Sequence, residues 1–270
     1  MKNIAASVFL IMLLCHGIPG SAEADADAAS EHWFYMVKTR SADPAREPEF
    51  NAWYDEIDIP DVLAVPGFMR ARRGLQQTIA EFPQLDLQET EGKYVALYDI
   101  ETTDIDKTII DLYVGARRMV AQGRITDLLK VTEANYYRRR ISGYRPAVTE
   151  SAGDNYVYIR KVLCCADEDG RTRLLDWLEN NYVPELVGID GVSGVRAYEL
   201  YRIMEVVSVG PDEIPHLLLV HEITTGSIIQ AVVEIQDTVN RIDQAGGVDG
   251  LFVEGNDSAV YLQLSEQHSE

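Results

Sequence analysis

Residues 53–63, with the sequence WYDEIDIPDVL, recur in altered form at residues 177–187 as WLENNYVPELV. The two stretches lie 124 residues apart and align without a gap, so that a Trp, a Pro and the acidic residues on either side of the Pro coincide. The match continues to an Arg, which is Arg72 in the first copy and Arg196 in the second. An internal period of this length indicates two copies of one supersecondary unit.

Each copy predicts four strands and two helices in the order β-α-β-β-α-β, which is the ferredoxin-like arrangement. In the first copy the apolar patterns predict strands at 32–38, 68–75, 93–101 and 133–141, and helices at 47–60 and 103–122. In the second copy they predict strands at 156–163, 192–201, 215–223 and 259–264, and helices at 171–181 and 227–245. We expect Pro60 to end the first helix, because Pro disfavours the helical conformation in the residue before it.

A four-stranded sheet with two helices on one face has a second face to bury, and two linked copies can bury both by closing face to face. The predicted fold class is therefore α+β, with two tandem ferredoxin-like (βαββαβ) units forming a pseudo-dimeric α+β barrel. We assign residues 31–146 to the first unit, 147–154 to a linker and 155–268 to the second unit. The interior of such a barrel can hold one small ligand.

The amino-terminal segment has the features of a signal peptide. Residues 1–22 combine a Lys at position 2, an apolar run that is too short to span a bilayer, and small residues where cleavage would occur. Residues 23–30 are rich in Ala and acids, which predicts a disordered start to the mature chain. We therefore expect an exported protein, periplasmic or secreted, without membrane attachment after cleavage.

The amino-acid composition limits the kinds of molecule that we expect the chain to bind. The 270-residue chain has a formal net charge of −20, which argues against nucleic acid, because nucleic-acid binders present a basic face. Outside the signal segment the cysteines are the adjacent Cys164 and Cys165, which lack metal-ligand spacing. We expect a small-molecule substrate, no metal and no cofactor, and the sequence leaves homo-oligomerisation open.

Strand alternation places Arg and Tyr side chains on the face that we expect to line the barrel. The candidates for substrate binding are Arg72, Arg196, Tyr198, Tyr136, Trp53 and Trp177. Arginine forks bind carboxylates with two hydrogen bonds and stack on aromatic rings, so this set would suit a flat anionic or phenolic molecule. The alternative is that these arginines pair with the many acids of the chain or face solvent.

Residues 49–63, followed by Pro66-Gly67, resemble the EthD-like branch of the dimeric α+β barrel superfamily. That branch typically reads E-F-N-x-W-Y-D-x-x-H-[apolar]-P-D-[apolar]-L, then P-G and a strand. The resemblance implies the barrel fold and cofactor-independent decarboxylation, cyclisation or isomerisation of phenolic or polyketide-like molecules. The usual His of the pattern is replaced by Asp58 in the first repeat and by Tyr182 in the second.

The candidate catalytic residues are Asp58, Tyr182 and His221. Asp58 could act as a base, because burial raises a carboxyl pKa towards neutrality, and Tyr182 could donate a proton to an oxyanion. His221 lies inside a predicted strand and could titrate in a cavity. The structural alternatives are a solvated helix-end acid, a half-buried tyrosine and a buried hydrogen-bond donor. Other barrels of the superfamily bind haem through a His, so the resemblance also makes His221 a haem candidate.

The favoured function is an exported, cofactor-independent lyase of the decarboxylase type, acting on a small aromatic or phenolic carboxylic acid. One alternative is a non-catalytic binding protein for a small hydrophobic acid, and another is an isomerase or cyclase for a polyketide-like substrate. A titratable group within reach of the pocket centre would favour an enzyme, whereas aromatics and arginines alone would favour binding.

Overall fold

The computed structural model describes residues 29–79, 92–145, 153–163, 168–206, 217–245, 253–254 and 258–269. The expected signal peptide and the Cys164–Cys165 pair lie outside the described residues. In the part that is described, no helix is both long and apolar enough to cross a membrane.

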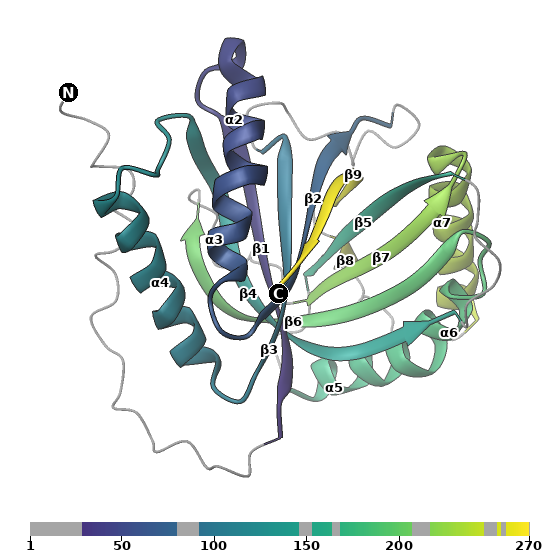
Figure 1. Ribbon diagram of the computed structural model, residues 1–270. Helices are drawn as coiled ribbons and strands as arrows, with labels where there is room; N and C mark the ends of the chain where they lie inside the picture. Colours follow the sequence, from purple (N-terminus) through teal and green to yellow (C-terminus); the bar gives the residue numbers. More distant parts are fainter. Residues whose placement is uncertain are drawn as a thin grey trace.

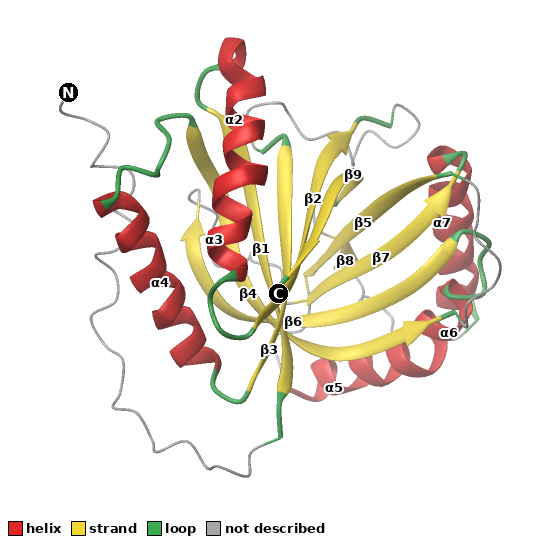
Figure 2. Ribbon diagram, viewed as in Figure 1, coloured by secondary structure: helices red, strands yellow, loops and turns green. Residues whose placement is uncertain are grey.

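Both repeats contain the predicted succession of elements (Figures 1 and 2). The first comprises β1 (Glu31–Ser41), η1 (Pro44–Arg46), α2 (Glu47–Trp53), η2 (Tyr54–Asp58), α3 (Ile59–Leu63), β2 (Phe68–Gln77), β3 (Tyr94–Thr102), α4 (Ile105–Ala121) and β4 (Leu129–Tyr144). The second comprises β5 (Asp154–Leu163), α5 (Glu168–Trp177), η4 (Leu178–Tyr182), α6 (Val183–Leu186), β6 (Val192–Val206), β7 (Leu217–Thr225), α7 (Ile228–Gln244), β8 (Val253–Glu254) and β9 (Ala259–His268).

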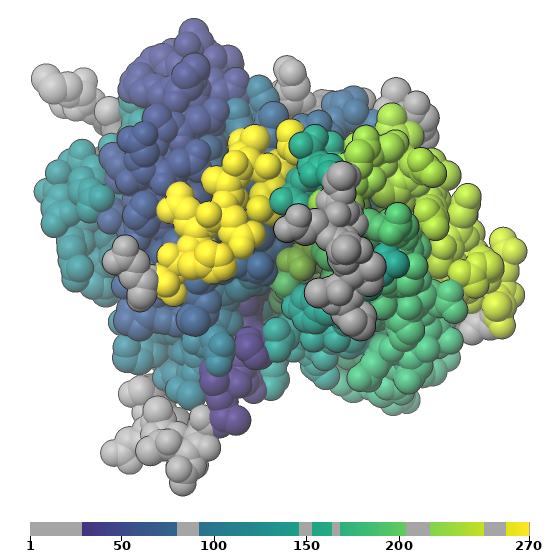
Figure 3. Space-filling model, turned by 45° about the vertical axis from the view of Figure 1, so that its right-hand side comes forward, coloured from purple at the N-terminus to yellow at the C-terminus, as the bar shows by residue number. Residues whose placement is uncertain are grey.

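In the described part of the chain, eight strands close into one antiparallel barrel. Their order is β7-β6-β4-β1-β3-β2-β9-β5, and β5 pairs with β7 to complete the ring, while the two-residue β8 flanks β5. The repeats meet twice, through β4 with β6 and through β2 with β9, and Figure 3 shows β9 crossing the surface between the two halves. The structure thus confirms the predicted pseudo-dimeric α+β barrel.

The helices cover the outside of the barrel, so each half of the sheet is buried on both faces (Figure 2). One apolar cluster fills the barrel interior and includes Phe34, Met36, Tyr137, Tyr198, Leu218 and Tyr261. A second cluster lies between the first sheet and the helices of the first repeat, and a third lies in the corresponding layer of the second repeat. The chain therefore has three places where a cavity could form.

The prediction that Pro60 ends the first helix is wrong, because the chain passes from α2 into α3 through a wider turn. In the π-helical segment η2 the N–H of Ile59 donates to the carbonyl of Tyr54, five residues earlier. Pro60 has no N–H, and its ring would clash with the carbonyl four residues before it in a regular α-helix, so the wider turn accommodates it. The same turn recurs at η4, ahead of Pro184, and the two turns end at Asp58 and Tyr182.

Candidate functional site

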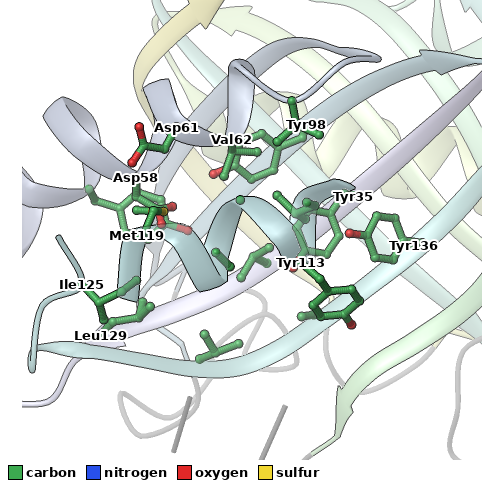
Figure 4. Close-up of a pocket in the computed structure, with 18 residues that line it drawn as sticks. Tyr35, Asp58, Asp61, Val62, Tyr98, Tyr113, Met119, Ile125, Leu129 and Tyr136 are labelled. Atoms are coloured by element: carbon green, nitrogen blue, oxygen red, sulfur yellow. The ribbon is translucent and has the colours of Figure 1, made fainter. Parts of the chain in front are cut away.

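A cavity of about 170 Å³ lies in the first repeat, between the outer face of its sheet and its helices (Figure 4). Its polar lining residues are Tyr35, Tyr54, Asp58, Asp61, Tyr98, Tyr113 and Tyr136. The rest of the lining is Val, Leu, Ile, Met, Ala and Gly, and none of its 18 described residues is Lys, Arg or His. The volume is close to that of the engineered cavity of about 150 Å³ that binds benzene, so one substituted aromatic ring fits.

Three tyrosines stand side by side on the sheet because their strands are in register. Tyr35 on β1 is the pairing partner of Tyr98 on β3 and of Tyr136 on β4. The ring of Tyr35 stacks on the ring of Tyr136 with centroids 4.2 Å apart, and on the ring of Tyr98 with centroids 5.8 Å apart. Because Tyr35 is stacked between its two neighbours, the row presents ring edges, which can contact an aromatic ligand edge to face.

Asp58 enters the cavity from the end of η2 and is partly buried. The pKa of the Asp58 carboxyl is raised to about 7, chiefly by burial and also by the carboxylate of Asp61, whereas Arg73 and Tyr98 lower it. Near neutral pH this group therefore exists in both protonation states. A carboxyl with such a pKa can take a proton from a ligand and return it.

The tyrosines around Asp58 remain protonated and can act as hydrogen-bond donors. Burial raises the pKa values of Tyr54, Tyr98 and Tyr136 well above the ordinary value of 10. The hydroxyl of Tyr98 is enclosed without a hydrogen-bond partner of ordinary geometry, although its ring is part of the cavity wall. A buried hydroxyl of this kind can bind a ligand oxygen.

In the second repeat the corresponding positions form a filled hydrogen-bonded network. The register of β5 and β7 pairs Tyr158 with His221, as β1 and β3 pair Tyr35 with Tyr98. The Nδ1–H of His221 donates to the carbonyl of Tyr158 at 3.0 Å, and Nε2 lies 2.9 Å from the Tyr182 hydroxyl. Arg160 Nη1 also donates to that hydroxyl, at 3.1 Å.

These hydrogen bonds bear on the expectation that His221 could ligate a haem iron. The side chain is fully buried, and both ring nitrogens are hydrogen-bonded. No ring nitrogen is left to ligate iron, so the residues present do not fit a haem. The structure does bring Tyr182 and His221 together, but in a different half of the molecule from Asp58.

The arginines predicted to hold a carboxylate are occupied by carboxylates of the chain. Arg72 and Arg196 point into the barrel and are almost fully buried. Both pair with Glu222, and Arg196 Nη2 lies 2.8 Å from its Oε1 atom. Arg196 also pairs with Asp99, while Tyr198 stacks inside the barrel on Phe34. The alternative reading, in which these arginines pair with acids, is the one that the structure supports.

The prediction that Tyr136 faces the barrel interior is wrong. Its neighbour Tyr137 points inward, whereas Tyr136 faces the helices and lines the cavity beside Asp58. A sheet covered on both faces gives the same apolar signal on each side, so alternation identifies residues that share a face without identifying the inner face. Tyr136 and Asp58 thus share a site that differs from the expected one.

The sequence matches no protein-family model and no curated protein. The fold, however, matches solved structures. One is described as an anthrone oxidase-like protein, with a TM-score of 0.55, 12% identity, and coverage of 88% of this chain and 94% of that chain. A putative monooxygenase from Fusobacterium nucleatum has a TM-score of 0.50 and 8% identity over 90% of this chain and 95% of its own. A putative chlorite dismutase has a TM-score of 0.50 and 11% identity over 87% of this chain and 95% of its own.

The chain has the dimeric α+β barrel fold. At these identities the likeness establishes the fold alone, so the chemistry has to be argued from the side chains of this barrel. Among the described residues, no group of three or more His, Cys, Asp or Glu side chains could hold a metal ion.

The two tryptophans of the repeat pack in the helical layers of the barrel. Trp53 donates from Nε1 to the carbonyl of Arg124 at 2.7 Å, and Trp177 packs against Tyr182 with centroids 5.8 Å apart. Both side chains are buried, and neither is among the lining residues of the cavity. The structure thus gives them packing contacts and leaves the predicted role in substrate binding without support.

Sequence reasoning missed four tyrosines of the cavity: Tyr35, Tyr54, Tyr98 and Tyr113. A signal was present, because Tyr35 and Tyr98 sit at the centres of their strands, where alternation gives them a common face with Tyr136. A second signal was the adjacent pair Gly115-Ala116 on the helix opposite the sheet, since small residues there leave room for a cavity.

Proposed function

We propose that the cavity of the first repeat binds a small, neutral phenol or aromatic ketone and catalyses proton transfer on it, with Asp58 as the acid–base group. The observation that carries this proposal is a carboxyl with a pKa of about 7 inside an aromatic cavity. Enzymes place general acids and bases near the working pH in this way.

The reaction that fits the site begins when the Asp58 carboxylate takes a proton from an acidic C–H or O–H group of the ligand. The ligand becomes an enolate or phenolate, and the hydroxyl of Tyr98 is placed to donate a hydrogen bond to its oxygen. Protonated Asp58 then returns the proton to another position of the ligand. The net result is an isomerisation, and it needs no redox partner.

The lining disfavours an ionised carboxylic acid as the ligand. Asp58 and Asp61 would repel a carboxylate, and the described lining residues include no Lys, Arg or His to bind it. A decarboxylase would therefore have to take its substrate as the neutral acid, which makes proton transfer on a phenol or ketone the better-supported reaction. The resemblance of residues 49–63 to the EthD-like branch and the fold shared with an anthrone oxidase-like protein both agree with an aromatic ligand.

The test is hydrogen–deuterium exchange into a panel of phenols and aromatic ketones in D₂O, followed by NMR, with phenolic carboxylic acids included and carbon dioxide release measured. We expect exchange in the wild type, its loss in Asp58→Asn, and its retention in Tyr182→Phe, which alters the corresponding position of the second repeat. Exchange lost in Tyr182→Phe but kept in Asp58→Asn would move the site to the second repeat. Binding without exchange or carbon dioxide release would establish a binding protein instead.

A further inference from the structure

The acid that follows the helical Pro pairs in both repeats with an arginine near the carboxyl end of the long helix, although the two arginines are not at matching positions. In the first repeat Asp61 Oδ1 lies 2.9 Å from Arg124 Nη1, just beyond the end of α4. In the second, Glu185 Oε2 lies 2.9 Å from Arg241 Nη2, in the last turn of α7. Each pair ties the short helix after the π-helical turn to the end of the long helix, and the contribution of such a pair to stability at an exposed site is small.

The two pairs differ in their surroundings. The side chains of Glu185 and Arg241 are 47% and 61% exposed, so that pair is largely solvated. Asp61 is only 22% exposed and lines the cavity, and its Oδ2 atom is enclosed without a hydrogen-bond partner. The first pair therefore places a charge inside the site, whereas the second does not.

The segment that carries Arg124 is held firmly against the helices. Gly123 adopts a left-handed conformation, with φ of +67°, which ends α4 and turns the chain. The carbonyl of Arg124 accepts the hydrogen bond from Trp53, and the next residue, Ile125, lines the cavity. The backbone of Arg124 is thus held beside α3, and its side chain, which is 42% exposed, reaches Asp61.

Asp58 and Asp61 are three residues apart on one helical face, so their carboxyls are neighbours. The other titratable or charged groups facing the cavity or Asp58 are Tyr54 from the same helix, Arg73 from β2, Tyr98 from β3, Tyr35 from β1, Tyr136 from β4 and Tyr113 from α4. Of two adjacent carboxyls, the one with the cationic partner stays ionised and the other takes the proton.

We propose that the Asp61–Arg124 ion pair is a positioning element that keeps Asp61 ionised and so makes Asp58 the proton-carrying member of the pair. This proposal rests on the function proposed above, because it names the ion pair that sets the protonation of Asp58, the acid–base group of that function. Asp61 and Arg124 act through Asp58 and need not touch the ligand.

The test follows the titration of Asp58 itself and needs no substrate. Protein labelled with ¹³C at the Asp carboxyl carbons is titrated from pH 4 to pH 9 by NMR, and the Asp58 signal is assigned from its absence in Asp58→Asn. The variants are Asp61→Asn, Arg124→Gln and, as the matched control from the second repeat, Arg241→Gln. Thermal denaturation of each variant establishes that it is folded.

We expect Asp61→Asn to lower the Asp58 midpoint by about one pH unit or more, because a neighbouring negative charge is removed. Arg124→Gln should also lower the Asp58 midpoint, because Asp61 without its cationic partner takes up the shared proton, and Arg241→Gln should leave the midpoint in place. Equal midpoints in all four proteins would overturn the proposal, as would a higher Asp58 midpoint in Arg124→Gln, because Asp61 would then stay ionised without Arg124. If Asp61→Asn does not fold, the comparison of Arg124→Gln with Arg241→Gln still tests the proposal. If Asp58 titrates as expected in all variants but no ligand exchanges hydrogen, the proposed reaction is refuted, whereas the inference about the Asp61–Arg124 pair still holds.

Discussion

Replacing Asp58 by Asn should change how the stability of the protein depends on pH. The wild-type carboxyl has a pKa of about 7 in the folded protein, against an ordinary value of 3.8 that we take for the unfolded chain. A carboxyl whose pKa is raised on folding stabilises the folded state when it is protonated. This contribution is fully present below pH 3.8 and is lost as the pH rises through about 7. Asn has no proton to lose, so the variant should not show the loss.

The expected size follows from the two pKa values. They differ by about three pKa units, and one unit corresponds to about 1.36 kcal/mol, so the full contribution is about 4 kcal/mol. Asp58 is partly exposed, and water reaching the carboxylate reduces this to about 2–4 kcal/mol. Relative to the wild type, Asp58→Asn should therefore gain about that much free energy of unfolding between pH 4 and pH 8.

The assay is urea denaturation at half-unit steps from pH 4 to pH 8.5 on the wild type, Asp58→Asn and the control Asp190→Asn. The Asp190 side chain is 93% exposed, so the control curve should run parallel to the wild-type curve. A difference between Asp58→Asn and the wild type that stays constant across this range would refute the reasoning, because it would mean that Asp58 titrates equally in the folded and unfolded states.

Three further predictions concern the tyrosines, the second repeat and the barrel interior. Tyr98→Phe should leave the free energy of unfolding within about 1 kcal/mol of the wild type in urea denaturation, since the lost hydroxyl makes no hydrogen bond of ordinary geometry, while weakening ligand binding measured by calorimetry. Tyr182→Phe should lower the free energy of unfolding by about 1–3 kcal/mol, because His221 and Arg160 lose a buried hydrogen-bond partner. The affinity for the ligand should not change, and a stable variant that lost affinity would contradict the assignment of the site to the first repeat. Glu222→Gln should destabilise the protein by about 3 kcal/mol in urea, because it leaves Arg72 and Arg196 short of negative charge inside the barrel, and an equally stable variant would show that those charges are solvated.

The fold was predictable from the sequence because the repeat fixes its main constraints. Matched positions such as Trp53 with Trp177 and Pro60 with Pro184 identify one unit used twice, and the order of strands and helices leaves two sheet faces to be buried. The error at Pro60 arose because the rule that Pro ends a helix assumes a regular α-helix before it. A π-turn removes the clash, and sequence periodicity does not reveal such a turn.

The site was only partly predictable. Asp58 was identified from its place in a motif, but its partners lie on three strands and a second helix, and only the closed structure brings them together. The partners of the arginines could not be predicted for a different reason. Pairing of Arg72 and Arg196 with Asp99 and Glu222 depends on strand register across the barrel, including irregularities in the pairing of β2 with β3 and of β6 with β7, which the sequence does not show.

The two repeats share a backbone plan, but their side chains fill the space between sheet and helices differently. Both long helices span 17 residues from matching N-caps, so Gly115-Ala116 on α4 occupies the place of Thr238-Val239 on α7. The larger pair closes space above the second sheet. Larger side chains of the second repeat also replace smaller ones at two other positions. Tyr182 at the end of η4 occupies the position of Asp58 at the end of η2, and Arg160 on the sheet occupies the position of Val37.

This asymmetry explains why fusing two units in one chain matters for function. In a barrel made of two identical chains every residue serves both sites, so a change that fills one cavity fills the other. In a single chain the second repeat can hold its hydroxyl, imidazole and guanidinium in a saturated buried network, while the first keeps a carboxyl that is incompletely solvated and incompletely paired. Buried groups with satisfied hydrogen bonds stabilise a fold, whereas an acid with a raised pKa weakens it at neutral pH. The satisfied network of the second repeat can therefore offset the cost of the raised pKa in the first, and the acid–base site that we propose would then occur once in each chain.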